Sequence, residues 1–93
     1  MTSNTTRIVV TRHAEEEIRR RGLDENLVRT IVATPDQVLP VRPGRMIHQS
    51  RVAMPPHDRV YLVRIVVDVK PDELEVVTAY RTSKIGKYWR EDT

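Results

Sequence analysis

The sequence predicts an α+β fold in which two N-terminal helices pack on one face of a four-stranded antiparallel sheet. Two short amphipathic segments come first, between residues 11 and 34. Four runs rich in β-branched residues follow, separated by short turns that contain proline, glycine or aspartate. Because the connections between these runs are short, sequential antiparallel pairing is the economical topology. A short C-terminal tail or helix is expected to end the chain.

The composition limits the kind of protein this is. The chain has 93 residues, enough for a single domain spanning residues 1–93 with one hydrophobic core. It has no Cys and no apolar run of the roughly 20 residues that span a bilayer, so we expect a cytoplasmic protein that does not enter membranes. Residues 1–6 are polar, lack the apolar segment of a signal peptide, and are expected to be flexible.

The first predicted helix begins at Thr11 or Arg12 and runs through Arg21. Its three glutamates lie toward the N-terminus and the arginines Arg19–Arg21 toward the C-terminus, which suits the helix dipole. Gly22 is suited to the C-terminal stop. The preceding stretch, Thr5 to Thr11, is β-branched and fits either a short strand or an extended arm.

The second predicted helix begins after Asp24, a residue that caps helix N-termini well. Thr34-Pro35 ends this helix, because the residue before a proline disfavours helical geometry. Between them, two apolar pairs spaced four residues apart lie on one face. These residues are Leu27 with Ile31 and Val28 with Val32. The two helices therefore form a hairpin with one apolar side, which we expect to lie on the sheet.

Alternation along the strands sorts their side chains onto two faces. The strands are expected at Gln37–Val41, Arg45–Met54, Arg59–Val69 and Leu74–Arg81. The face toward the helices is predicted to hold Tyr61, Val63, Ile65, Val67, Met46, Val52, Met54, Val77 and Ala79. The opposite face is predicted to collect Arg45, Arg51, Arg64, Thr78 and Tyr80.

Positive charge is concentrated in the second half of the chain. Residues 41–67 contain five arginines and one acid, Asp58, and residues 76–90 contain four basic residues and no acid. An open sheet face is commonly polar, which would account for most of these cations. Arg64 is different because both its neighbours in sequence are apolar, so its guanidinium requires an anionic partner or water.

Two groups of residues resemble a known family. The first comprises Thr11–Ala14 (TRHA) and Arg19–Gly22 (RRRG), and the second comprises Val77–Ile85 (VTAYRTSKI) and Lys87–Trp89 (KYW). Together they resemble a small bacterial domain family of unknown function, with His-Ala, Arg-Gly and Val-Thr-x-Tyr motifs, that belongs with the RelE/ParE-like toxin superfamily (the barnase–EndoU–colicin–RelE fold). The resemblance covers about residues 10–89 and implies two helices packed on a curved antiparallel sheet.

The resemblance implies a toxin-like, metal-independent endoribonuclease, restrained by a cognate antitoxin. In such a reaction the ribose 2′-OH attacks the neighbouring phosphate, so the site needs a base, an acid and cations. No metal or cofactor is expected, because the three histidines are widely spaced and lack suitable acids nearby. The predicted catalytic residues are His13, Arg64, Thr78 and Tyr80, and the predicted RNA-binding residues are Arg51, Lys84, Lys87 and Tyr88.

Several alternatives stay open on the sequence alone. His13 fits a catalytic acid or base, because imidazole titrates near neutral pH, but it also fits a helix residue packed against the sheet end. His48 has the parity of a core-side residue, and His57 lies in a proline-rich turn. The whole chain also fits a non-catalytic RNA- or protein-binding module on the same fold, or a gyrase-poisoning ParE-like toxin.

Overall fold

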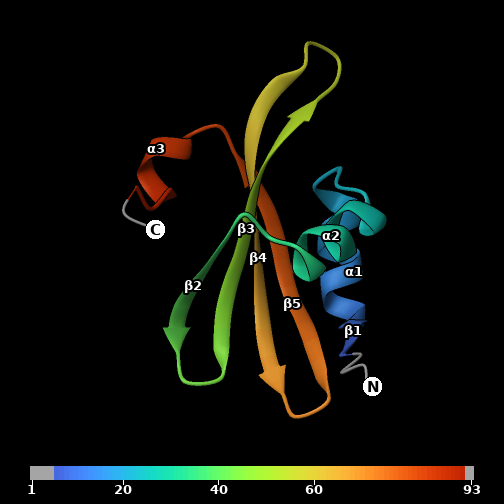
Figure 1. The fold of residues 1–93 in the computed structure, drawn as a ribbon. Helices are drawn as coiled ribbons and strands as arrows, with labels where there is room; N and C mark the ends of the chain where they lie inside the picture. The colour runs from blue at the N-terminus through green and yellow to red at the C-terminus, as the bar shows by residue number, and fades with distance from the viewer. Residues whose placement is uncertain (1–5, 92–93) are drawn as a thin grey trace, which may run out of the picture.

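Over residues 6–91, the part of the chain that is described, the computed structural model has five strands in one sheet and three helices (Figure 1). The elements in chain order are β1 (Arg7–Val10), α1 (Arg12–Arg20), α2 (Glu25–Ala33), β2 (Gln37–Arg42), β3 (Arg45–Met54), β4 (Arg59–Lys70), β5 (Glu73–Thr82) and α3 (Ile85–Tyr88). Residues 1–5, which belong to the segment expected to be flexible, lie outside the described residues.

The sheet has the strand order β1-β5-β4-β3-β2. The strands β2 to β5 pair in antiparallel sequence as predicted, but β1 adds a fifth strand parallel to β5, so the four-stranded prediction was one strand short. Arg7 lies beside Glu73 and forms an ion pair of 3.2 Å with it. A local pattern could not predict this, because the partner of this four-residue strand begins 66 residues further along the chain.

The first two helices begin and end close to the predicted residues. Thr11 caps α1 by accepting a hydrogen bond from the Ala14 backbone at 3.0 Å, and Asp24 caps α2 in the same way from Asn26 at 2.9 Å. Gly22 follows α1 with φ of 69°, the left-handed conformation that glycine adopts without strain. None of the described helices is long and apolar enough to cross a membrane.

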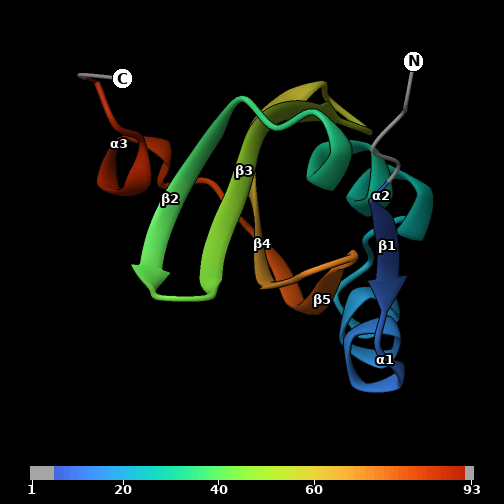
Figure 2. The same ribbon diagram turned by 60° about the horizontal axis from the view of Figure 1, so that its bottom comes forward.

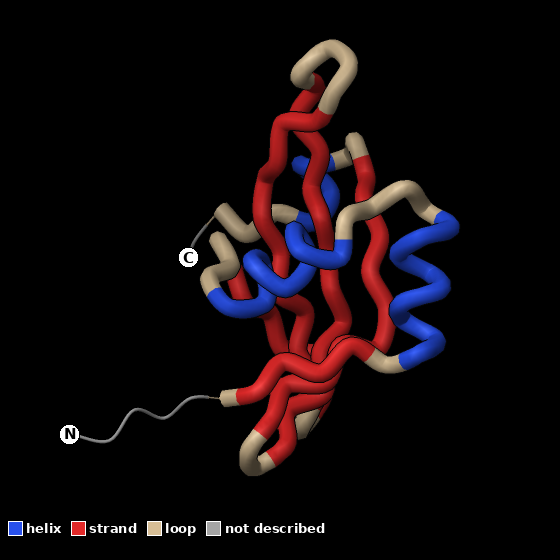
Figure 3. The backbone as a smooth tube through the Cα atoms, turned by 90° about the vertical axis from the view of Figure 1, so that its right-hand side faces the viewer, coloured by secondary structure: helices blue, strands red, loops and turns tan. Residues whose placement is uncertain are grey.

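Helices α1 and α2 lie on the same face of the sheet, while α3 lies on the other side (Figures 2 and 3). The core between these two helices and the sheet includes Val63, Ile65 and Val67 of β4, none of which is exposed. The helices contribute Ala14, Ile18, Val28, Ile31 and Val32 to the same cluster. The predicted core face of β4 is confirmed.

Strand β5 corrects one predicted core residue. Thr78 pairs with Val66 whereas Val76 pairs with Val67, so Val77 is an extra residue at a β-bulge. The bulge shifts the alternation of side chains by one residue. As a result Val76, rather than the predicted Val77, lies in the core together with Ala79.

His48 is buried on the helix side of β3, as its parity predicted. Its Nδ1 lies 3.0 Å from the carbonyl oxygen of Val32, so in the neutral ring Nδ1 carries the proton and donates it to that oxygen. Burial disfavours the charged imidazolium and holds the pKa of His48 below its ordinary value of 6.5, although the bond to Val32 partly opposes this shift.

We expect this histidine to make the domain less stable in mild acid. The unfolded chain takes up a proton on residue 48 below about pH 6.5, while the folded chain, with its lower pKa, does not. The free energy of unfolding should therefore fall as the pH drops from 7 to 5. The free energy measured by urea unfolding should depend less on pH in His48→Gln than in the parent. The matched variant His57→Gln should behave as the parent. An equal pH dependence in His48→Gln would contradict this assignment.

Candidate functional site

Four polar side chains form a row across the sheet face opposite α2. Tyr80, Arg64, Gln49 and Gln37 are direct neighbours on β5, β4, β3 and β2. Arg64 donates from Nη1 to the Tyr80 hydroxyl at 2.7 Å and from Nε to Gln49 Oε1 at 2.9 Å. Gln49 in turn donates from Nε2 to Gln37 Oε1 at 2.8 Å. We call these four residues the polar row.

Strand alternation explains where Arg64 lies. Its neighbours Val63 and Ile65 both point into the core under the helices, so the arginine between them must point to the other face. The predicted side of Arg64 is therefore confirmed. Gln49 is placed in the same way, because His48 and Ser50 beside it pair with core-facing residues of β4.

The C-terminal segment covers this row. Residues 84–91, which we call the strap, run from the end of β5 back across the sheet to β2. The Arg64 guanidinium carbon lies 4.1 Å from the centre of the Tyr88 ring, and Gln49 donates to the Tyr88 carbonyl at 3.3 Å. Gln37 donates from Nε2 to the Arg90 carbonyl at 2.6 Å, and its Oε1 accepts the Arg90 backbone N–H at 3.1 Å. The face expected to be open is thus partly covered, and Arg64 is only 8% exposed.

The charge of Arg64 is not neutralised by any described residue. Its contacts are an amide, a phenol and the ring of Tyr88, all of which are neutral, and none of the ion pairs within residues 6–91 includes it. Its two side-chain bonds use two of the five N–H donors of a guanidinium. Arg45 on the same sheet face differs, since it holds Asp68 through two bonds of 2.6 and 3.0 Å and lowers the pKa of that carboxyl.

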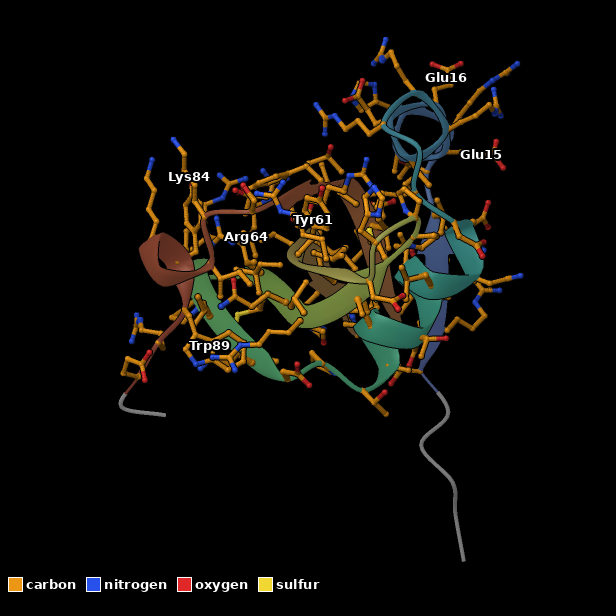
Figure 4. All side chains as sticks on the ribbon, turned by 90° about the horizontal axis from the view of Figure 1, so that it is seen from above. Glu15, Glu16, Tyr61, Arg64, Lys84 and Trp89 are labelled. Carbon is orange, nitrogen blue, oxygen red and sulfur yellow. The ribbon has the colours of Figure 1, made fainter. Side chains whose placement is uncertain are left out.

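The predicted RNA-binding residues gather around the row. Lys84 and Lys87 are exposed on the strap, and Lys87 Nζ lies 5.3 Å from the ring centre of Tyr88. Arg51, two residues from Gln49 on the same face of β3, stacks on the Trp89 ring at 3.9 Å. Figure 4 shows Lys84 and Arg64 on the same side of the molecule. Cations and aromatic rings therefore alternate over this surface.

Two predicted catalytic residues lie outside the row. His13 is exposed near the start of α1, and α1 packs beside β5, away from α3 (Figures 1 and 2). The Thr78 hydroxyl receives a bond of 3.3 Å from Arg21, whose same nitrogen also binds the Ala79 carbonyl at 2.9 Å. The structure therefore joins Arg64 with Tyr80 but not with His13 or Thr78. The catalytic roles of all four residues stay predictions.

The sequence reasoning missed the glutamines. Gln49 is fully buried and Gln37 is nearly so, although glutamine is usually exposed. Parity alone would have placed Gln49 beside Arg64, but the importance of both residues depends on the strap, which no local pattern reveals. A second group was also missed, in which Arg59 and Arg81 lie 5.5 and 4.9 Å from the Tyr61 ring on the helix-facing side.

No three His, Asp or Glu side chains within residues 6–91 are grouped so that they could hold a metal ion. The fold and the site together define a small α+β domain with a cationic and aromatic sheet face. The chain belongs to the family described as Domain of unknown function (DUF4258), which matches residues 10–81. No match was found among curated proteins or among solved structures. The family match includes the polar row but not the strap.

Proposed function

We propose that this domain binds single-stranded RNA across the polar row and the strap. The observation that carries the proposal is the buried Arg64 guanidinium, whose described partners are all neutral. A buried cation is costly unless an anion compensates it, and the phosphate of a nucleic acid is an anion that matches guanidinium geometry. The exposed lysines of the strap provide the additional charge that backbone binding requires.

Tyr80 offers the point of contact for a phosphate. Its oxygen already accepts a hydrogen bond from Arg64, so its own O–H is left to donate to another acceptor. The neighbouring positive charge polarises the phenol and strengthens that donation. Tyr80 is also more exposed than Arg64, which lets the phosphate meet the hydroxyl first, with the guanidinium behind it.

The dimensions and the rings favour a single strand over a duplex. Neighbouring strands lie about 4.8 Å apart, so the four residues of the row span roughly 14 Å, enough for a few nucleotides. Tyr88 and Trp89 lie along this path and are partly exposed. Unpaired bases can stack on such rings, whereas the bases of a duplex are already stacked on each other.

Metal-independent RNA cleavage is the second candidate function. It is favoured by Tyr80, which could protonate the departing 5′ oxygen while Arg64 stabilises the charge on phosphorus, and by the resemblance to RelE/ParE-like toxins. The reaction also needs an acceptor for the 2′-OH proton. The described contacts of Arg64 include no imidazole or carboxylate, and His13 lies on α1, so binding is the better supported function.

A protein partner belongs to the same proposal. The resemblance to RelE/ParE-like toxins implies an antitoxin, and acidic side chains would complement the exposed cations of the strap. Such a partner would compete with RNA for this face. The gyrase-poisoning alternative predicts instead that the domain is toxic without RNA loss.

Binding to a fluorescein-labelled oligouridine, measured by anisotropy, tests the proposal. We expect binding that weakens as salt rises, by a slope of roughly −0.7 per phosphate contact on logarithmic axes, and that EDTA does not alter. No binding to RNA at low salt would contradict the proposal. End-group analysis decides the second candidate: a 2′,3′-cyclic phosphate supports cleavage, while uncut RNA or a requirement for divalent metal refutes this mechanism.

A further inference from the structure

A pocket lies at the β2 end of the polar row, where β2 forms the open edge of the sheet. It is lined by Asp36, Gln37, Val38, Trp89, Arg90 and Glu91. Figure 4 shows Trp89 and Lys84 pointing to different sides of α3. The pocket therefore lies at the opposite end of the strap from Lys84. It combines the indole of Trp89 with two carboxylates and one cation, Arg90.

Asp36 is held in place by the adjoining strand. Its backbone N–H donates to the Gln49 carbonyl at 3.0 Å and to the Ser50 hydroxyl at 2.9 Å. Its Oδ2 accepts the Arg51 backbone N–H at 3.0 Å. A carboxylate has about four acceptor sites, so this bond leaves capacity for a ligand. Because Asp36 is exposed, a ligand can approach it.

Trp89 is fixed beside this carboxylate. Its backbone N–H donates to the Ile85 carbonyl at 2.9 Å, and the next residue is bound to Gln37. The Arg51 guanidinium stacks on the indole at 3.9 Å, which makes the ring part of a layered stack and not a freely moving side chain. Arg51 thus contacts both residues: its backbone N–H donates to the Asp36 carboxylate, and its guanidinium stacks on the Trp89 ring.

We propose that this pocket is a subsite for a guanine base, an inference that rests on the RNA-binding function proposed above. Guanine is the base whose Watson–Crick edge presents two adjacent N–H groups, N1–H and N2–H, and a carboxylate can accept both in charge-assisted bonds. The indole supplies a surface for stacking. Two of the three charged residues that line the pocket, Asp36 and Glu91, are acidic and only Arg90 is basic, so the pocket favours phosphate less than the Arg64 end does. This end of the path therefore takes a base and the Arg64 end takes the backbone.

The fluorescence of Trp89 provides a direct test, because it is the only tryptophan in the chain. The probes are the RNA pentamers UUGUU, UUAUU, UUCUU and UUUUU. A fifth, the inosine pentamer UUIUU, has inosine in place of guanosine and so lacks only the 2-amino group. We expect UUGUU to quench the tryptophan and to bind about tenfold to a hundredfold more tightly than UUAUU, the discrimination typical of a bidentate contact. The inosine pentamer should fall between the two.

Asp36→Asn should abolish the preference for guanine and leave the affinity for UUUUU unchanged. The matched variant Asp58→Asn removes a carboxylate from the β3–β4 turn, at a residue with φ of 51°, a conformation that asparagine also tolerates, and should keep the preference. Equal affinity for all the pentamers, with binding still dependent on Arg64, would overturn the guanine subsite and leave the RNA-binding function intact. No binding of any pentamer would overturn both, and an unchanged preference in Asp36→Asn would overturn the role of Asp36.

Discussion

Ile65→Ala is expected to lower the free energy of unfolding by about 2–5 kcal/mol. Ile65 is fully buried in the centre of β4, paired with His48 on one side and Ala79 on the other, and covered by the two N-terminal helices. Truncation removes apolar contacts and leaves a cavity that neighbouring backbone cannot fill. Small domains are stable by only about 5–15 kcal/mol, so this one change would remove a large part of the total.

Chemical denaturation of the parent and the variant measures this effect. Val69→Ala on the same strand is the matched control, because Val69 is 46% exposed and its truncation should cost well under 1 kcal/mol. Ile65→Val should lie between them, at about 0.5–1.5 kcal/mol. A loss below about 1 kcal/mol in Ile65→Ala would mean that the residue is not buried in the folded domain in solution.

Local patterns predicted most of the elements of this fold. Thr11 and Asp24 could be recognised as helix caps because capping depends on residues within one turn. The alternation Tyr61, Val63, Ile65, Val67 fixed the core face of β4 because side chains in a strand alternate with a period of two. In both cases, the information lies within a few residues of the structure that it determines.

The features that could not be predicted depend on distant residues. The pairing of Arg7 with Glu73 joins residues 66 positions apart in the sequence, and nothing in either segment identifies its partner. The bulge at Val77 arises from how β5 fits against β4, and it shifts the faces of the residues before it. A pattern read within a single strand contains neither kind of information.

The candidate site was partly predictable for the same reason. Parity placed Arg64 and Tyr80 together because each lies in a regularly paired stretch of its strand, Tyr80 on the C-terminal side of the β5 bulge. It could not place His13, whose position depends on how α1 docks against β5, or reveal that Tyr88 covers Arg64. The glutamines became recognisable only when β2, β3 and the strap were seen side by side.

Arg64→Ala is expected to weaken the binding of oligouridine by about tenfold to a hundredfold. The change removes the buried positive charge behind Tyr80, and hydrogen bonds to charged groups contribute roughly 1.5–3 kcal/mol. If the domain also cleaves RNA, the rate should fall by about a hundredfold, because the developing charge on phosphorus loses its stabilising cation. Arg42→Ala is the matched control, since it removes the same charge from an exposed residue at the far end of β2.

Two further variants separate binding from folding. Removal of Arg64 leaves Gln49 without its donor, which itself costs about 1–3 kcal/mol of stability, so each variant must first be shown to be folded by circular dichroism. Arg64→Lys keeps the charge and should retain part of the affinity, while losing the fork of donors that joins Gln49 to Tyr80. Tyr80→Phe removes only the hydroxyl and should weaken RNA binding with little loss of packing. Parental affinity in a folded Arg64→Ala variant would show that RNA does not use this cation, and the binding face would then have to lie elsewhere on the domain.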